Sequence, residues 1–137
     1  PCHYSYNFVV TKTDDEYVLN LKQNIRSGDS ILGTPTNVMF ASFFLAIMAT
    51  SLGYNIGELK TSIDDYHVYS NHTKFASKMI RDTTIDFATD CFPQVHRISK
   101  DIGSFDDMLS LEWSDIESDR DYHFAYNWSR KDLPMAV

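Results

Sequence analysis

The strongest constraint on the fold is an apolar run over residues 37–54, in which few polar side chains interrupt the hydrophobic ones. Large apolar residues recur there at helical spacing, and Gly53 is a natural stop signal. The run therefore predicts a long helix that lies in the centre of a hydrophobic core. Its most apolar part, residues 40–52, is too short to span a bilayer, so we expect no membrane segment.

Alternating patterns before this run predict β-strands. Aromatic or apolar residues alternate with polar ones over residues 4–10 and again over residues 17–26, and a polar stretch at 11–16 separates the two. This arrangement is typical of a β-hairpin with one buried face. Residues 27–35 are rich in Gly, Ser, Thr and Pro, which predicts a loop.

The remaining sequence predicts shorter elements. We expect strands at 56–69 and 92–99, a short helix at 71–81, a capped helical turn at 104–107, a final strand at 108–113 and a surface loop at 114–134. No internal repeat or linker divides the chain. The prediction is a single α+β domain over residues 1–137.

Charge and cysteine content disfavour several classes of function. The 137 residues carry a formal net charge of −7, whereas a nucleic-acid partner needs a basic surface. One or two arginines still suffice for a single small phosphate. The sequence has no signal-peptide pattern, and its two cysteines, Cys2 and Cys91, form no disulfide framework. We therefore expect free thiols and a cytoplasmic location.

Four short motifs carry the functional information. They are Cys2-His3, then Arg26-Ser27-x-Asp29 with Leu32-Gly33-x-Pro35-x-Asn37, then His67-x-Tyr69-Ser70-Asn71-His72, and last Met135-Ala136-Val137. In this order and at this spacing, the motifs resemble those of the thymidylate synthase family. The resemblance covers nearly the whole chain and is densest over residues 26–72 and at both ends.

The resemblance implies a mixed sheet with a long buried helix. It also implies that the sheet face of residues 4–10 and 17–26 joins two subunits in a homodimer. In that family the nucleophilic cysteine lies near the middle of the chain, so we expect residues 1–137 to be the C-terminal catalytic portion, with the N-terminal half absent from this chain. The isolated chain is then expected to be inactive without that half, whether it comes from the same protein or from a separate chain.

The activity that the resemblance implies is a methyltransferase reaction. A one-carbon unit passes from the co-substrate 5,10-methylenetetrahydrofolate to C5 of dUMP, which gives dTMP and dihydrofolate. Cys2 would add to C6 as a thiolate and so make C5 nucleophilic. Arg26 would favour that thiolate by its charge and would also bind the phosphate. The structural alternative for Cys2 is a small buried apolar residue.

The same resemblance assigns contacts to the nucleotide. Ser27 would donate its hydroxyl to the phosphate, and the Asn37 amide, which both donates and accepts, would bind the O4 and N3–H edge of uracil. His67 and Tyr69, on one face of a strand, would contact the deoxyribose hydroxyl. The structural alternatives are an ordinary loop serine, a helix N-cap at Asn37, and a half-buried aromatic pair in the sheet.

Folate contacts are implied as well, and Asp29 would serve both the substrate and the pterin ring. The full set is Asp29, Leu32, Gly33, Tyr69, Met135, Ala136 and Val137. The terminal carboxylate of Val137 would close over the cofactor and exclude water. The alternatives are a solvated loop acid at Asp29 and a frayed terminus at Val137. No metal is expected, because His67 and His72 lack the spacing of a helical ligand pair.

Three departures from the family pattern leave the product open. Ile25 stands where glutamine is usual, Thr36 where phenylalanine is usual, and residues 61–64 lack the usual tryptophan and paired glycines. Loss of the phenylalanine at Thr36 and the added carboxylate of Asp64 would make the pocket wetter and more polar, which would favour capture of the intermediate by water, as in deoxyuridylate or deoxycytidylate hydroxymethylases of the same family. Asn37 favours uracil over cytosine. A second alternative is a non-catalytic remnant that binds nucleotide or dimerises, and a third is an acidic α+β binding module.

Overall fold

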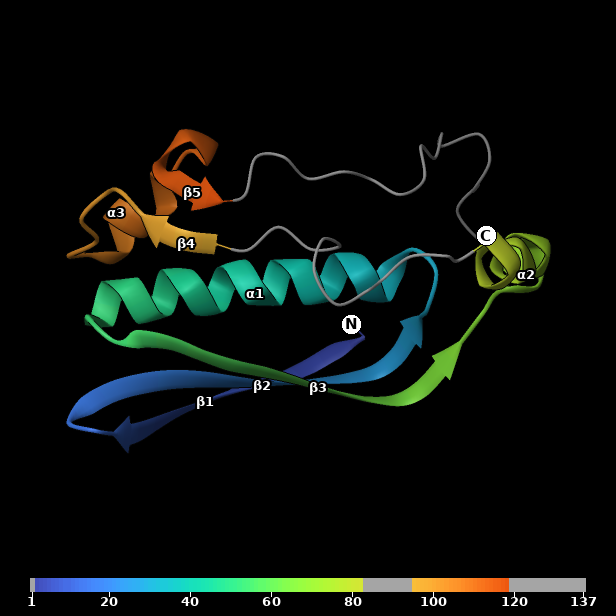
Figure 1. Ribbon diagram of the computed structural model, residues 1–137, viewed down its shortest axis with the longest axis horizontal. Coiled ribbons are helices and arrows are strands. Elements are labelled where there is room, and N and C mark those ends of the chain that lie inside the picture. The colour runs from blue at the N-terminus through green and yellow to red at the C-terminus, as the bar shows by residue number, and fades with distance from the viewer. Residues whose placement is uncertain (1, 83–94, 119–137) are drawn as a thin grey trace.

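The computed structural model of the chain describes residues 2–82 and 95–118. A long helix lies along one face of a three-stranded sheet, and a small two-stranded sheet lies on the other side of that helix (Figure 1). The predicted α+β class is confirmed.

The described elements follow one another in a simple order. They are β1 (His3–Thr13), β2 (Glu16–Asp29), α1 (Gly33–Leu52), β3 (Asn55–His67), the 3₁₀ turn η1 (Ser70–His72), α2 (Thr73–Asp82), β4 (Val95–Ile98), α3 (Phe105–Leu109), the 3₁₀ turn η2 (Trp113–Asp115) and β5 (Ile116–Ser118). The large sheet has the order β1-β2-β3, with β1 antiparallel and β3 parallel to β2. The antiparallel pair of β4 and β5 forms the small sheet. Because α1 makes the crossover between two parallel strands, the ends of β2 and β3 and the start of α1 meet at one end of the sheet.

The predicted hairpin is confirmed, with a tighter turn than expected. Only Asp14 and Asp15 separate β1 from β2, and their φ angles are 50° and 68°. Two positive φ angles match a two-residue turn to the twist of the strands, and aspartate tolerates this region better than most residues. Lys12 Nζ lies 2.7 Å from Asp15 Oδ1 beside the turn. The other residues of the predicted turn belong to the strands.

The hydrophobic core lies between β2 and α1. Alternate residues of β2 turn toward the helix and are at most 2% exposed, and small or branched residues four apart on α1 pack against them. The set is Leu19, Leu21, Gln23 and Ile25 of β2 with Ala41, Leu45 and Ala49 of α1. Phe8 of β1 extends this core through an edge-to-face contact with Phe44, with ring centroids 5.3 Å apart.

Helix α1 begins earlier than predicted, at Gly33, and ends where predicted. The carboxylate of Asp29 accepts backbone N–H groups at its start, and Pro35 is tolerated in the first turn because N–H groups there lack helical partners. At its end, Gly53 takes the left-handed conformation with φ 67°. Asn37 is consequently inside the helix, and its predicted role as N-cap is wrong.

Because of its early start, α1 is longer than the apolar stretch seen in the sequence. By length and composition it could cross a membrane, which residues 40–52 alone could not. Its buried residues pack against β2, however, as those of a core helix do. Its other sides still expose Phe40 and Leu52.

The C-terminal predictions are confirmed in part. η1 and α2 occupy the predicted helix, and β4 lies within the predicted strand at 92–99, of which 92–94 lie outside the described residues. The predicted turn at 104–107 starts α3, where Ser104 Oγ accepts from Asp107 N at 3.1 Å. The predicted strand at 108–113 is wrong, because this cap and a capping box at η2 favour helical turns. β5 also replaces part of the predicted loop at 114–134, of which 119–134 are not described.

A bulge between β2 and β3 depends on Gly57. The register shifts between Leu19 and Leu21, and Asn20 Oδ1 accepts from the backbone N of Glu58 at 2.9 Å within the shift. A Cβ atom on Gly57 would lie 2.5 Å from Asn20 Oδ1 and 2.7 Å from the carbonyl oxygen of Leu19. The backbones approach too closely there for any side chain.

Candidate functional site

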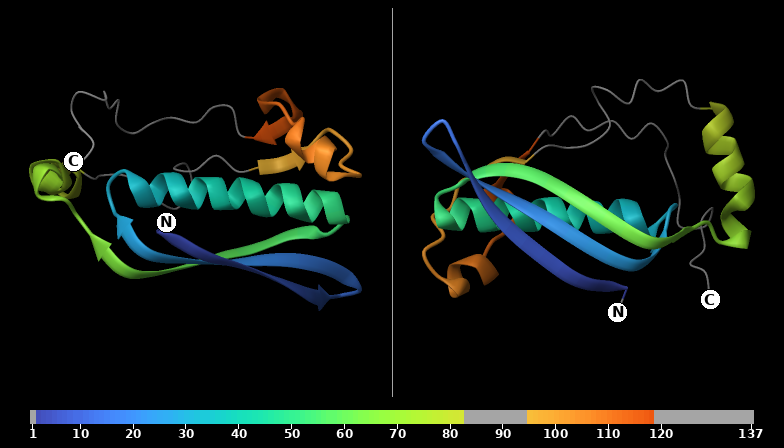
Figure 2. Two further views of the ribbon diagram at one scale, coloured as in Figure 1. Left: turned by 180° about the vertical axis from the view of Figure 1, so that it is seen from behind. Right: turned by 90° about the horizontal axis from the view of Figure 1, so that it is seen from below.

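Three of the four motif segments meet at one end of the large sheet. β1 starts at this end, β2 and β3 finish there, and α1 starts there, as the three ribbon views agree (Figures 1 and 2). The topology therefore gathers the predicted residues of the Cys2, Arg26 and His67 motifs, although they are distant in the sequence. α2 lies beyond the same end.

Cys2 lies beside Arg26, on the neighbouring strand. The backbone N of Arg26 donates to the Cys2 carbonyl oxygen at 2.7 Å, which continues the β1–β2 pairing beyond His3 and Ile25. The Cys2 thiol is free, and both Cys2 and Arg26 are exposed. The alternative of a buried apolar cysteine is therefore wrong. An exposed thiol next to a cationic residue is accessible to an electrophile and suits a thiolate nucleophile.

Ser27 and His67 are linked by Asp65, a residue to which the sequence predicted no role in the site. Ser27 Oγ donates to Asp65 Oδ2 at 3.2 Å, and His67 Nδ1 lies 3.2 Å from the same oxygen. The second contact falls short of hydrogen-bond geometry, and Nδ1 has no other hydrogen-bond partner within the described residues. No residue pattern in the sequence pointed to Asp65. Its place in the site follows from the parallel pairing of β2 and β3, which puts Asp65 opposite Ser27.

His67 and Tyr69 are brought together, although not as predicted. β3 ends at His67, so Tyr69 lies beyond the strand, in the position that caps η1. Their rings still meet edge to face, with centroids 4.9 Å apart and an interplanar angle of 85°. The shared strand face is therefore wrong, while the proximity of the two side chains is confirmed.

The carboxylate of Asp29 caps the start of α1. Oδ1 accepts from the backbone N of Ile31 at 3.0 Å, and Oδ2 accepts from those of Leu32 and Gly33 at 3.3 Å each. A negative charge at a helix N-terminus is also favourable to the helix dipole. The alternative of a solvated loop acid is wrong. Oδ1 keeps room for one further hydrogen bond, because each carboxylate oxygen accepts two.

We expect Asp29→Ala to lower the free energy of unfolding by about 1–2 kcal/mol, because the first turn of α1 loses its acceptors. Asp29→Asn, which keeps one amide oxygen as acceptor, should lose less. Urea denaturation of the full-length protein, followed by circular dichroism, measures both changes. Equal stability of Asp29→Ala and the wild type would contradict the capping role.

Asn37 and Thr36 occupy the first half of α1. The half-buried amide of Asn37 makes no hydrogen bond within residues 2–82 and 95–118, so it remains available to a base. The hydroxyl of Thr36 is engaged, since Oγ1 donates to the carbonyl oxygen of Leu32 at 2.9 Å. Thr36 consequently adds less polarity to its surroundings than its residue type suggests.

Asp64 lies on the opposite face of β3 from its neighbours Ile63 and Asp65, because strand residues alternate. Its Oδ2 accepts from Tyr4 Oη at 3.3 Å, across the sheet face that α1 leaves uncovered. Desolvation and then the charge of Asp64 raise the pKa of the Tyr4 phenol. Asp64 therefore does not contact the Ser27–Asp65–His67 group.

Some predictions fall outside the described part of the chain. Met135, Ala136 and Val137, expected to bind folate, lie there, and so does Cys91. Among the described residues, no group of three or more His, Cys, Asp or Glu side chains could hold a metal ion.

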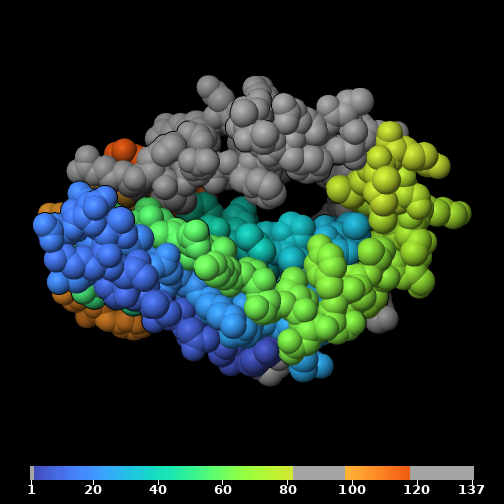
Figure 3. All heavy atoms as spheres, turned by 60° about the horizontal axis from the view of Figure 1, so that its bottom comes forward, coloured from blue at the N-terminus to red at the C-terminus, as the bar shows by residue number. Residues whose placement is uncertain are grey.

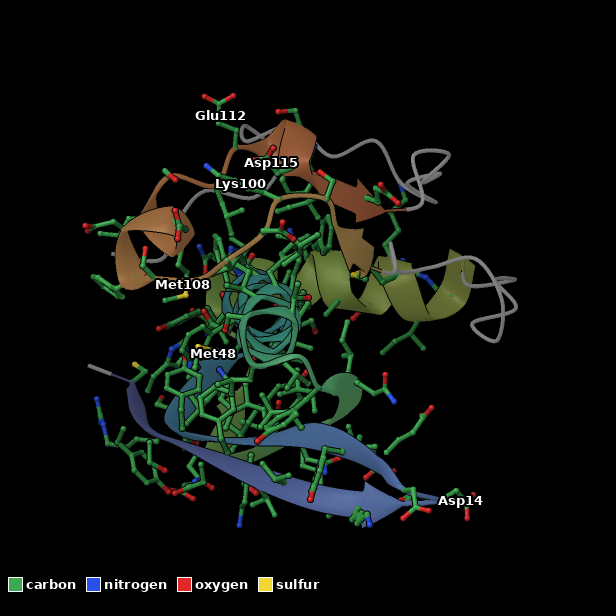
Figure 4. The ribbon with its side chains drawn as sticks, turned by 90° about the vertical axis from the view of Figure 1, so that its left-hand side faces the viewer. Asp14, Met48, Lys100, Met108, Glu112 and Asp115 are labelled. Atoms are coloured by element: carbon green, nitrogen blue, oxygen red, sulfur yellow. The ribbon has the colours of Figure 1, made fainter. Side chains whose placement is uncertain are left out.

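A separate open pocket of about 260 Å³ lies at the other end of α1. Met48 of α1 and Met108 of α3 line it together with residues 102–105 (Figure 4). The predicted residues surround the first turn of this 20-residue helix, which is about 30 Å long. The pocket is therefore remote from them.

Comparison with known proteins gives one consistent family. A family model described as thymidylate synthase matches residues 1–126. A thymidylate synthase of Mycoplasma mobile is 39% identical over 72 residues, which are 53% of this chain and 24% of that protein. One of Leuconostoc mesenteroides subsp. mesenteroides is 38% identical over 71 residues, which are 52% of this chain and 21% of that protein. The matched segment spans a quarter or less of these relatives.

Proposed function

The chain belongs to the thymidylate synthase family, and on that basis we propose that the protein containing it transfers a one-carbon unit from 5,10-methylenetetrahydrofolate to C5 of dUMP. The observation that supports this most is the meeting of Cys2, Arg26, Ser27 and His67 at one end of the sheet. Cys2 directly precedes β1, Arg26 and Ser27 belong to β2, and His67 ends β3, and each is of the type that its assigned step needs.

In the proposed reaction Cys2 supplies the nucleophile. Its thiolate forms a bond to C6 of uracil, and the electron pair of the C5–C6 double bond moves toward O4 as an enolate. C5 then has the electron density to attack a one-carbon electrophile. C5 forms a bond to the one-carbon unit of the folate, and loss of the C5 proton then breaks the bond between that carbon and the folate nitrogen, which leaves an exocyclic methylene on the base. A hydride from the folate adds to this methylene as the bond from Cys2 to C6 breaks, which gives the methyl group, dihydrofolate and the free thiolate.

Several described residues have groups that are free to bind a nucleotide. The Cys2 thiol is exposed and free, and the Arg26 side chain makes no ion pair with any described residue. The Asn37 amide keeps all its donors and acceptors for the uracil edge. Ser27 differs, because its only proton is donated to Asp65. Donation to a phosphate would require Ser27 to release that partner.

The fit to folate is partial. Asp29 retains one acceptor position on Oδ1 for a pterin N–H, while the backbone N–H groups of Leu32 and Gly33 are already bonded to Asp29 Oδ2. Leu32 and Gly33 therefore offer apolar contact. Tyr69, which is 42% exposed, has a ring face available to the same ligand.

A 5-methyl product is favoured over a 5-hydroxymethyl product. The argument for capture by water came from the added polarity of Thr36 and Asp64. Thr36 is bonded to the helix backbone, and Asp64 lies on the other face of β3. Neither side chain adds polarity beside His67 and Ser27, which supports the proposal of a 5-methyl product.

We further propose that two subunits pair through the sheet face opposite α1, in the cytoplasm. Figure 3 shows β1, β2 and β3 side by side on this face. Short polar side chains form hydrogen bonds across it, with Asn24 Nδ2 donating to Ser5 Oγ at 2.6 Å and Asn7 Nδ2 to the same oxygen at 3.3 Å. Short side chains permit close approach of a second sheet.

Covalent trapping tests the proposed function. We expect the full-length protein, incubated with fluorodeoxyuridylate and methylenetetrahydrofolate, to gain the mass of both ligands, because fluorine at C5 cannot leave as a proton. Intact mass spectrometry measures the adduct. It should disappear in Cys2→Ala and persist in Cys91→Ala, the matched control. Absence of an adduct in the wild type would favour the non-catalytic remnant.

A further inference from the structure

We propose that Asp65 is a positioning residue, which sets the tautomer of His67 so that Nε2 is the free hydrogen-bond acceptor for the sugar hydroxyl of the nucleotide. The role of the nucleotide rests on the proposed function, whereas the tautomer can be measured without any ligand.

The geometry rests on one carboxylate oxygen. Asp65 Oδ2 lies 3.2 Å from Ser27 Oγ on β2 and 3.2 Å from His67 Nδ1 on its own strand. The parallel register places Ser27 opposite Asp65, and two residues further on it places Asp29 opposite His67. Asp65 thereby joins the segment assigned to the phosphate with the residue assigned to the sugar.

The environment of His67 determines which nitrogen carries the proton. Nδ1 is screened from solvent, and Asp65 Oδ2 lies 3.2 Å from it. A carboxylate only accepts, so a favourable contact needs the proton on Nδ1. The neutral ring then has its lone pair on Nε2. A sugar hydroxyl can donate to that lone pair.

One further contact and the exposed fraction of the side chain support this orientation of the His67 ring. Tyr69 packs edge to face against His67, which restricts rotation of the imidazole. About a quarter of the His67 side chain stays exposed, 27%, so part of the ring remains reachable by a ligand while Nδ1 does not. The Nδ1 contact is less well aligned than a formed hydrogen bond, as is common for such contacts before a ligand binds.

The first test measures the tautomer in the ligand-free, full-length protein labelled with ¹⁵N-histidine. We expect the His67 signal, assigned by its loss in His67→Gln, to show the Nδ1–H pattern. Asp65→Ala should convert it to the Nε2–H pattern. Asp64→Ala makes the same charge change one residue away and should leave it unchanged. An Nε2–H pattern in the wild type, or no change in Asp65→Ala, would overturn the proposal.

The second test measures binding by calorimetry of dUMP and of 2′,3′-dideoxyuridine 5′-monophosphate, which lacks the 3′-hydroxyl. Asp65→Ala should weaken dUMP binding about tenfold relative to binding of the dideoxy nucleotide, as loss of a ligand-orienting partner does, because the release of Ser27 from Asp65 affects the phosphate of both nucleotides alike. Asp64→Ala should affect neither. An equal loss for both nucleotides would overturn the positioning role. If the wild type binds no dUMP, the proposed function fails, and the tautomer alone decides the role of Asp65.

Discussion

Replacing Cys2 by alanine is expected to lower the turnover of dUMP in the full-length protein by at least about 10⁴-fold, the scale seen when an enzyme loses its nucleophile. Without the sulfur no bond to C6 forms, and C5 stays too poor a nucleophile to take the one-carbon unit. Cys2→Ser should be nearly as impaired, because a serine hydroxyl is scarcely ionised at neutral pH. Formation of dihydrofolate, followed by absorbance, measures the rate.

The expected loss concerns chemistry rather than folding. Cys2 is exposed, so its substitution removes no core packing, and thermal denaturation should be unchanged. Cys91→Ala, which removes the other cysteine, should keep its activity within a few-fold. Turnover in Cys2→Ala within a hundredfold of the wild type would exclude Cys2 as the nucleophile.

Gly57→Ala is expected to lower the free energy of unfolding by about 2–3 kcal/mol, the range for forcing an extra methyl into a packed site. The new Cβ would meet Asn20 Oδ1 at 2.5 Å and the carbonyl oxygen of Leu19 at 2.7 Å. The Asn20 side chain could rotate away, but it would then lose the hydrogen bond that it accepts from the backbone N of Glu58. The carbonyl of Leu19 belongs to the central strand and cannot move independently.

Gly103→Ala is the matched control, because the nearest atom to its new Cβ, Asp107 Oδ2, lies 3.8 Å away. This variant should be as stable as the wild type or slightly more stable, since alanine reduces the freedom of the unfolded chain. Urea denaturation of the full-length protein measures both variants. Similar midpoints for Gly57→Ala and Gly103→Ala would show that the bulge relaxes without cost.

Local patterns were sufficient to predict the hairpin, the long helix and its end at Gly53. They failed where a side chain competes with the pattern. Asp29 starts α1 earlier than its apolar residues indicate, and the caps at Ser104 and Glu112 turn an apparent strand into helical turns. Gln23 lies fully buried in the core, where its Oε1 accepts from Thr61 Oγ1 at 3.3 Å and its Nε2 has no hydrogen-bond partner among the described residues. The periodicity of the sequence does not predict a buried polar residue at this position.

The residue types of the site could be predicted from the sequence, but the contacts between their side chains could not. Order and spacing of the motifs selected Cys2, Arg26 and Ser27, which the structure places at one end of the sheet. The role of Asp65 depends on the register between β2 and β3, which is a long-range property. A shift of one residue would turn Asp65 and His67 together to the other face of the sheet, away from Ser27.

The bonds from Asp29 to the start of α1 have a consequence for how this region tolerates changes in length. Only Ser30, Ile31 and Leu32 separate β2 from α1. The Asp29 carboxylate accepts from the backbone N–H groups of Ile31, Leu32 and Gly33, so it fixes two of the three connecting residues and the first residue of the helix. An inserted residue here would rotate α1 and move Asn37 relative to the end of β2. The turn at Asp14 and Asp15 has no such constraint, so insertions between related sequences should accumulate there and be absent after Asp29.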